Sequence, residues 1–252
     1  MMRLLFLSFI FLLMLLAAVA LAFEKKNILM YFPFDEDKGD TAKDASGNQN
    51  DGTLAAGAKF TKDGKIGGAA EFSGNSFMRV NDSPTTSPRD AITIAAWINV
   101  ESRGEQNIVG QDSSYQLQLE GGGNIQAQYN RGADWSYTAA GPYPINEWFH
   151  AAITYDGKKA ACYQNGAEIA TGAVTGQLQD ATNPVCIASW QCGGSEWVQG
   201  RLDEVAVFDI ALSEKEIKSI TEKSIGKMFS AAEPKGKLAT VLGEIKSGIY
   251  SY

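Results

Sequence analysis

Two short segments of this sequence combine aromatic rings with amide or carboxylate groups. The first runs from Asn130 to Tyr137, and the second runs from Trp190 to Trp197 with two indoles around a glycine pair. Aromatic faces stack on sugar rings, while amides and carboxylates hydrogen-bond sugar hydroxyls. If both segments lie at one rim of the fold, they form a groove for a glycan; the alternative for Trp135 is a strand position packed inside. The candidate ligand-binding residues are Asn130, Asp134, Trp135, Tyr137, Trp190 and Trp197.

Nucleophilic catalysis finds no support in the sequence. His150 is the only histidine, and no Ser or Cys nucleophile can be tied to it with an orienting acid. Apolar residues flank it on both sides, which predicts a packed, hydrogen-bonded strand residue rather than a general base or a metal ligand.

The cysteines favour a structural role. Cys186 and Cys192 are close enough in the sequence to close a small disulfide loop, whereas Cys162 lies in an alternating strand, where a buried free thiol is an equally good interpretation. The chain has neither a CxxC motif nor a second histidine from which to build a zinc site.

Strands must position these residues, because the dominant period of the sequence is two and short runs are broken by Gly, Asn and Asp. Asp156-Gly157 and Asn165-Gly166 are pairs that accept positive φ in hairpin turns, so 148–169 is predicted to form a three-stranded meander. One helix is expected, opening at Ser213 with Glu216 as a capping box and ending near Gly226. The fold class is therefore all-β: a two-sheet antiparallel jelly-roll β-sandwich with one C-terminal helix.

The N-terminus predicts export. Residues 1–22 hold one charge and a short apolar run that ends in Ala20 and Ala22, the A-x-A pattern of a signal peptide cleaved after Ala22. The alternative is a retained anchor, but no stop-transfer pattern follows, and no transmembrane span is expected in the mature chain. We expect a secreted, cell-surface or periplasmic protein with one sandwich domain over 23–226 and a tail over 227–252.

The charge excludes one class of partner. The formal net charge is −7, and no basic stripe is visible. Nucleic acid is therefore not an expected partner, because phosphates demand clustered Lys and Arg.

Blocks of residues spread over about 28–224 together resemble LamG-like (laminin G type 3-like) domains of the concanavalin A-like lectin/glucanase superfamily. The resemblance rests on their order and approximate spacing. The blocks are Tyr31–Glu36, Asp44–Gly47, Gly64–Ala69, Ile92–Ile98, Trp148–Gly157, Tyr163–Gly166 and Gly200–Val205.

The resemblance implies a possible structural calcium ion. Related sandwiches hold calcium between an early acidic loop and an acidic residue of a late strand, which implies Asp44 and Asp203 as ligands with Asp35 as a third. The alternative is that these Asp side chains form turns by bonding to their own backbone. The loop from Asp35 to Asp51 does not satisfy the EF-hand pattern.

The acidic motif of the related glucanases can be compared with this sequence. Related glucanases carry their acids as E-x-D-x-E or E-x-D-x-x-E on one strand face, and no such run exists here. Adjacent Asp203 and Glu204 would point to opposite faces of a regular strand. We therefore expect a non-enzymatic recognition module that binds an extracellular glycan or a glycosylated surface protein; the alternative is a protein-adhesion domain with no sugar site.

Overall fold

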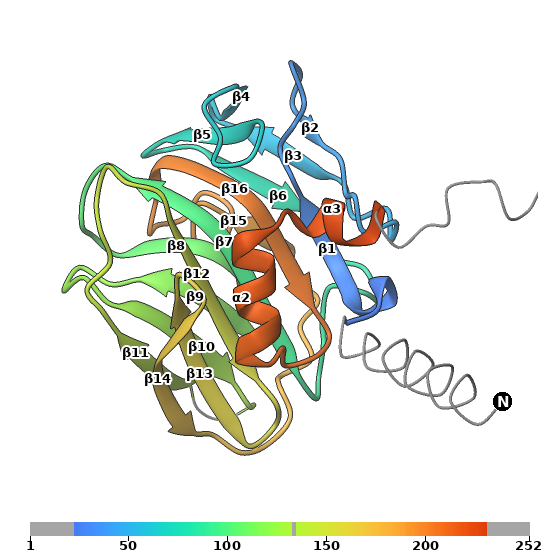
Figure 1. Cartoon of the computed structure of the whole chain (residues 1–252), viewed down its shortest axis with the longest axis vertical. Coiled ribbons are helices and arrows are strands. Elements are labelled where there is room, and N and C mark those ends of the chain that lie inside the picture. Colours follow the sequence, from blue (N-terminus) through green and yellow to red (C-terminus); the bar gives the residue numbers. More distant parts are fainter. Residues whose placement is uncertain (1–22, 133–134, 231–252) are drawn as a thin grey trace, which may run out of the picture.

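The structure is a computed structural model that describes residues 23–132 and 135–230, and its chain folds into two antiparallel sheets packed face to face (Figure 1). The predicted signal peptide and the predicted tail beyond residue 230 lie outside the described residues. Among the described residues, no helix has both the length and the apolar character needed to cross a membrane.

The first sheet carries most of the long strands. Its hydrogen-bonded order is β14 (Ala167–Ala173), β13 (Lys159–Gln164), β12 (Phe149–Tyr155), β7 (Ile92–Val100), β16 (Gln199–Phe208), β5 (Ala69–Ser73) and β4 (Lys59–Thr61), and β1 (Ile28–Phe32) pairs with β16. The predicted meander is confirmed: β12, β13 and β14 are consecutive antiparallel neighbours, and Asn165 and Gly166 both have positive φ at the second turn.

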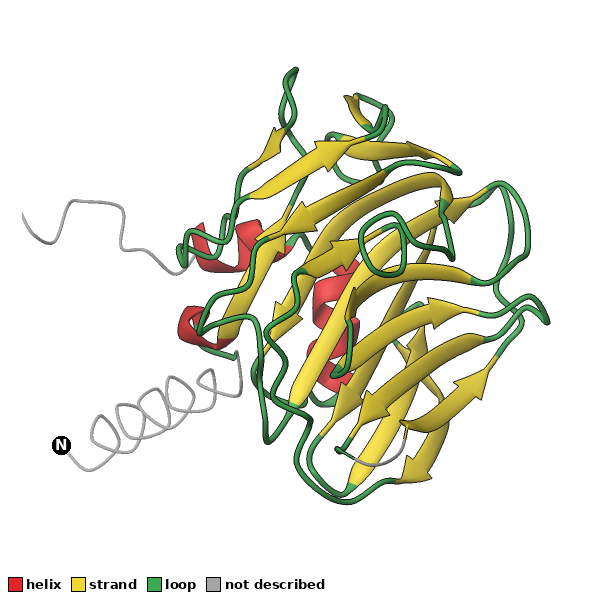
Figure 2. Ribbon diagram, turned by 180° about the vertical axis from the view of Figure 1, so that it is seen from behind, coloured by secondary structure: helices red, strands yellow, loops and turns green. Residues whose placement is uncertain are grey.

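The second sheet is the one that faces the viewer in Figure 2. Its order is β11 (Trp135–Ala140), β10 (Ile125–Asn130), β9 (Tyr115–Leu119), β8 (Gln106–Gln111), β15 (Val185–Ile187), β6 (Phe77–Val80), β3 (Gly52–Ala55) and β2 (Thr41–Ala42). Alternation along these strands sends one set of side chains into the space between the sheets, where Tyr115, Leu117 and Tyr129 join the main core.

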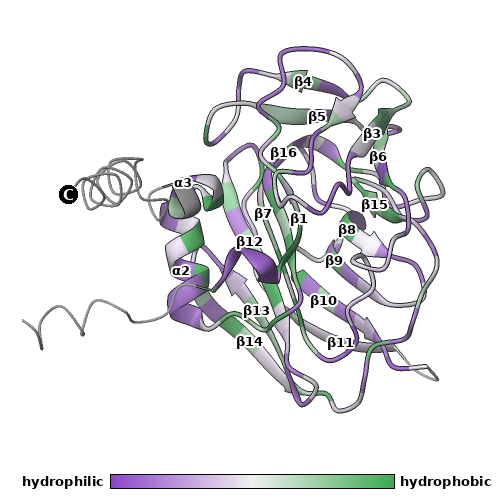
Figure 3. Ribbon diagram, turned by 90° about the vertical axis from the view of Figure 1, so that its right-hand side faces the viewer, coloured by the Kyte–Doolittle hydropathy of each residue, from purple (hydrophilic) through white to green (hydrophobic). Residues whose placement is uncertain are grey.

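The helices cover the outer face of the first sheet, away from β9–β11 (Figure 3). After a short 3-10 turn, η1 (Lys25–Asn27), they are α2 (Glu214–Glu222) and α3 (Ile225–Ser230). The capping box of Ser213 and Glu216 forms as predicted. The helix stops earlier than predicted because Lys223 is extended, and the backbone N–H of Ile225 donates to the buried carboxylate of Glu204, where α3 begins.

His150 lies beneath α2 as a packed strand residue. Its Nδ1 is 3.1 Å from Thr221 Oγ1 of α2, and its ring meets Trp97 edge-on. Burial lowers the pKa of His150 to about 3, so the ring is neutral at physiological pH.

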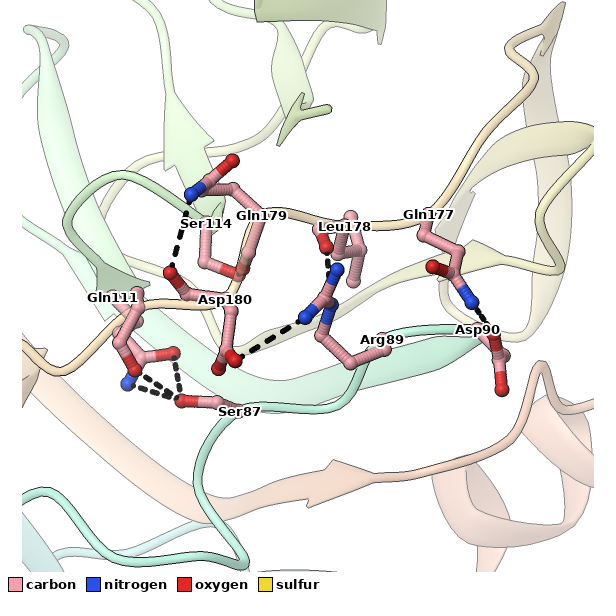
Figure 4. A network of polar contacts seen from close by, with 10 residues as sticks. Ser87, Arg89, Asp90, Gln111, Ser114, Gln177, Leu178, Gln179 and Asp180 are labelled. Atoms are coloured by element: carbon pink, nitrogen blue, oxygen red, sulfur yellow. Dashed lines mark hydrogen bonds and ion pairs between the residues drawn. The ribbon is translucent and has the colours of Figure 1, made fainter. Parts of the chain in front are cut away.

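The long connection from β14 to β15 is fastened to residues 87–90 by polar side chains (Figure 4). Arg89 donates from Nε to the carbonyl of Leu178 at 2.7 Å and pairs with Asp180 at 3.2 Å. The backbone N–H of Gln179 donates to the carbonyl of Asn130 at 2.8 Å. The connection therefore borders the end of β10, next to the start of β11.

Candidate functional site

Side chains with amide groups cover the outward face of the second sheet at its β9–β11 end. Leu117 and Leu119 of β9 and Ala127 and Tyr129 of β10 are buried in the core, so their alternate neighbours point outward. The strand register aligns Gln118 with Gln126 and Gln116 with Gln128. We call this surface the amide face and define it by Asn107, Gln116, Gln118, Gln126, Gln128 and Asn130.

Hydrogen bonds link the amides to one another and to a carboxylate. Gln128 donates from Nε2 to Gln126 Oε1 at 2.5 Å and also to Gln118 Oε1. Gln126 donates from Nε2 to Glu120, whose other oxygen accepts from Asn124 at 2.8 Å. Because Gln126 accepts from Gln128 and donates to Glu120, the row is held in one orientation before any ligand arrives.

Two indole rings meet over this face. Trp135 at the start of β11 and Trp190 from the loop after β15 lie 6.1 Å apart between ring centroids, at an interplanar angle of 72°. Both indoles are half-buried. Trp190 comes close to the sheet because position 110 is glycine: a Cβ built there would stand 3.0 Å from Trp190 Cζ3.

A buried acceptor lies beside the same indole. Asn107 is fully buried, and its Nδ2 donates to the carbonyls of Cys186 and Ser189, but its Oδ1 has no hydrogen-bond partner. That Oδ1 is 2.6 Å from the Cβ position built on Gly110. The amide face thus holds an unpaired acceptor close to Trp190.

The loop that carries Trp190 is held at both ends. The predicted disulfide between Cys186 and Cys192 is present in the structure, and Cys162 is the buried free thiol. Farther along the loop, Glu196 accepts a hydrogen bond from Gln116 Nε2 at 2.6 Å, and burial raises the pKa of the Glu196 carboxyl. These contacts fix the loop relative to β15 and β9.

The structure brings together part of the predicted ligand-binding set. Trp135 and Trp190 meet, and Asn130 and Tyr137 lie on the same outward face through the register of β10 and β11. Tyr137 is the most exposed large hydrophobic residue of the described chain, at 58%. Trp197 instead packs against Phe77 of β6. Asp134 lies outside the described residues.

Two of the predicted calcium ligands accept hydrogen bonds from backbone N–H groups, while Asp203 Oδ1 is buried without a hydrogen-bond partner among the described residues. Asp35 Oδ1 accepts from Gly68 N and Asp203 Oδ2 accepts from Ile66 N, each at 2.8 Å, so both carboxylates hold the same turn. In the described chain, no cluster of three or more His, Cys, Asp or Glu residues is arranged to hold a metal ion.

Asp44 has its own set of donors. Its Oδ1 accepts from the N–H groups of Tyr31 and Ser46, and its Oδ2 accepts from Ser46 Oγ and the N–H of Asn50, all between 2.8 and 3.0 Å. A cation needs carboxylate lone pairs, and here N–H and O–H donors occupy them. These bonds fix the loop around Asp44, and a calcium ion at this loop stays a prediction.

The adjacent acids of β16 are structural. Asp203 and Glu204 lie at a bulge opposite β7, and Glu204 has φ of 50°. Glu204 accepts from the hydroxyl of Tyr31 at 2.8 Å and from Ser224 at 3.1 Å. Burial raises the pKa of Asp203 to about 7 and raises that of Glu204.

The four glutamines of the amide face are not among the predicted ligand-binding residues, although the sequence carries a signal for them. In the segments YQLQLE and IQAQYN, glutamine alternates with apolar residues at the period of a strand. This pattern assigns the apolar set to the core and the amides to the opposite face. The predicted ligand-binding residues were instead chosen for their aromatic rings and polar groups, in the segments 130–137 and 190–197.

Solved structures of similar fold include binding domains. The binding domain of Paraclostridial Mosquitocidal Protein 1 has a TM-score of 0.66 at 19% identity over 78% of this chain, and the chain spans 52% of that structure. The receptor binding domain of botulinum neurotoxin C/D mosaic serotype has a TM-score of 0.64 at 15% identity, over 79% of this chain and 52% of its own. This chain thus spans about half the length of either structure.

A third neighbour matches over nearly its full length. Domain 4 of AbnA, a GH43 extracellular arabinanase from Geobacillus stearothermophilus, was solved in complex with arabinotriose; it has a TM-score of 0.64 at 20% identity, over 77% of this chain and 98% of that domain. No curated protein matches the chain in sequence. These likenesses show a shared fold. The family pattern matches residues 72–218, more than half of the chain, so this protein belongs to the concanavalin A-like lectin/glucanases superfamily.

Proposed function

We propose that this protein is an exported, non-catalytic module that binds carbohydrate through the amide face. The observation that carries the proposal is the meeting of Trp135 and Trp190 over a row of pre-oriented amides. Indoles supply an apolar surface for sugar rings, and amides supply both donors and acceptors for hydroxyl groups. Binding surfaces of this composition are typical of small-molecule sites in which a few polar groups fix the orientation of the ligand.

The molecules bound in two structural neighbours support the proposal of a carbohydrate ligand. The arabinanase domain was solved in complex with arabinotriose, and the binding domain of botulinum neurotoxin DC was solved in complex with SialylT. Their identities of 20% and 13% are too low to transfer a ligand to this chain, so the proposal rests on this chain's own residues.

The carboxylates near the amide face have structural partners, which supports binding without catalysis. Glu120 accepts hydrogen bonds from Gln126 and Asn124, and Glu196 accepts one from Gln116. Glycosidases instead need one free acid to protonate the leaving group and a second acid to attack or to activate water.

Export is supported by the N-terminal sequence pattern and by the disulfide. A disulfide persists in an oxidising compartment, and the Cys186–Cys192 bridge holds the loop of the proposed site. The predicted cleavage after Ala22 is testable by N-terminal sequencing of the protein secreted by its host.

The alternative, a protein-adhesion domain, would require a broad exposed apolar patch. Among the described residues, the exposed large hydrophobic side chains are Tyr137 at 58% and Ile145 at 39%. Tyr137 lies beside the amide face, opposite Gln128 in the register of β10 and β11. The described surface therefore favours a glycan over a flat apolar protein partner.

The test is binding of the purified protein to a broad glycan array, repeated with Trp135→Ala and Trp190→Ala. We expect binding to one glycan class, with at least a tenfold loss in either variant. Trp148→Ala is the matched control, because Trp148 is a half-buried indole that packs under Arg201 on the first sheet. Absence of binding by a folded wild-type protein, or equal binding by all four proteins, would overturn the proposal.

A further inference from the structure

The outward positions of β8–β11 carry no positive charge. Across these strands they are occupied by amides, Gly110, Trp135, Tyr137 and Ala139. A carboxylate or sulfate on a glycan is recognised in proteins by a guanidinium or ammonium group that can pair with it. Gln116 and Gln118 are buried, whereas Gln126, Gln128 and Asn130 are partly exposed, so these three offer hydrogen bonds to hydroxyl groups but no cationic partner for an anion.

The charges nearest to the amides are negative. Glu120 accepts a hydrogen bond from Gln126, and the half-buried Glu196 accepts one from Gln116 Nε2 at 2.6 Å. Burial, and to a smaller extent the charge of Glu105, raises the pKa of the Glu196 carboxyl. An anionic sugar bound beside Gln126 or Gln116 would approach one of these carboxylates.

The guanidinium at the edge of the site is already engaged. Arg131 follows β10 directly, and it donates from Nη1 to the carbonyl of Thr175 and from Nη2 to Ser136 Oγ, both at 2.7 Å. Another cation of the same sheet face, Arg79, lies on β6, beyond β8 and β15. These two bonds hold the guanidinium against the β14–β15 connection and Ser136, at the rim of the amide face and not over its glutamines.

From these three observations, and resting on the proposed function, we infer that the amide face selects neutral glycans and rejects those that carry carboxylate or sulfate groups. Hydroxyl groups can donate to the amide carbonyl oxygens and accept from the amide N–H groups. The nearby carboxylates favour hydroxyl donors and repel anions. Selectivity thus arises from two effects: the amides hydrogen-bond sugar hydroxyls, and the nearby carboxylates repel an anionic glycan.

The experiment compares matched glycan pairs that differ only in a sialic acid, a uronic carboxylate or a sulfate. We expect each neutral member to bind at least tenfold more tightly than its anionic partner. Raising the salt concentration from 50 to 500 mM should leave the affinity for neutral glycans unchanged. It should reduce the difference in affinity between neutral and anionic glycans, because salt screens the repulsion between the anion and the carboxylates. Gln128→Arg should raise the affinity for the anionic members, and Gln128→Asn is its matched neutral control.

The outcomes separate this inference from the proposed function. Equal or tighter binding of anionic glycans that is lost in Trp135→Ala would overturn the inference and leave the glycan-binding function standing. No binding of any glycan by a folded protein would overturn both. Glu120→Gln provides an independent check. Removing that charge should reduce the ratio of the affinities for neutral and anionic glycans, while the hydrogen bond from Gln126 persists.

Discussion

The indole of Trp190 meets the indole of Trp135 edge-on, with 6.1 Å between the ring centroids, although the two residues belong to distant parts of the second sheet. Trp135 begins the edge strand β11, whereas Trp190 extends from the loop after β15. The strands β10, β9 and β8 lie between them in the sheet order, so the two side chains reach toward each other over the amide face.

The first prediction concerns the glycine beneath Trp190. In Gly110→Ala, the new Cβ would stand 2.6 Å from Asn107 Oδ1 and 3.0 Å from Trp190 Cζ3, so the indole must shift. We expect glycan affinity to fall severalfold and the free energy of unfolding to fall by about 1–3 kcal/mol, the usual cost of overpacking. Glycan titration and chemical denaturation measure the two effects.

Gly104→Ala is the control for that variant, because nothing lies within 4 Å of a Cβ built at position 104. It should leave both affinity and stability nearly unchanged. Full affinity in Gly110→Ala would show that the position of Trp190 has no bearing on binding.

The second prediction concerns the disulfide. Cys192→Ser removes the bridge that closes the short loop bearing Trp190, which should lower the free energy of unfolding by roughly 2 kcal/mol through the added freedom of the unfolded chain. Glycan affinity should also fall, because Trp190 is no longer tethered to β15. Reduction of the wild-type protein with dithiothreitol should reproduce the loss of affinity.

Cys162→Ala tests whether that loss is specific to the bridge. Cys162 is a buried free thiol whose Sγ is 3.1 Å from the carbonyl of Thr138, away from the loop. Its removal costs stability through a small cavity but should leave affinity intact. If reduction left binding at full strength, the bridge would not be what positions Trp190.

The sequence predicted the strands and turns better than it predicted which side chains of distant strands approach one another. The period of two and the Asn165-Gly166 turn are local signals, and the meander they predicted is present. The approach of Trp190 to Trp135 depends on the crossover from β14 to β15, on the disulfide and on Gly110, which no local pattern encodes. The sandwich was therefore predictable, whereas the geometry of the site required the assembled sheets.

The predicted calcium ligands show that a residue type can suit two different roles. Acidic loop residues suit both a cation and the backbone N–H groups of a turn, and composition alone does not distinguish the two. The backbone conformation decides: around Asp44 it directs three N–H groups and a hydroxyl onto the carboxylate.

The third prediction follows from these donors. Asp44→Asn replaces one acceptor oxygen by an amide NH2 that faces N–H or O–H donors, which should lower the free energy of unfolding by about 2–3 kcal/mol. The melting temperature should fall equally in calcium and in chelator. Asp37→Asn is the control, because Asp37 makes only an exposed ion pair with Lys62 at 3.5 Å. A calcium-dependent gain in melting temperature that Asp44→Asn abolishes would instead establish a calcium site.

The fourth prediction is a pH dependence caused by Asp203. Burial raises the pKa of its carboxyl to about 7 in the folded protein, against 3.8 for an ordinary Asp. Between these two values the folded state binds more protons than the unfolded state, so the free energy of unfolding falls as pH rises. The contribution is fully present below pH 3.8 and is lost as pH rises through about 7, at up to about 1.4 kcal/mol per pH unit.

Asp203→Asn isolates this effect, because the amide does not titrate and its oxygen can still accept from Ile66 N. The difference in free energy of unfolding between variant and wild type should grow in favour of the variant from pH 4 to pH 8. Glu204, whose pKa burial also raises, and His150, whose pKa burial lowers to about 3, titrate in both proteins. The contribution of His150 therefore cancels in the difference, whereas Glu204, whose charge helps to raise the pKa of Asp203, shares in the effect of the substitution. Parallel stability curves for the two proteins would show that Asp203 is ionised throughout this range and that the polar groups of the turn at Ile66 offset its burial.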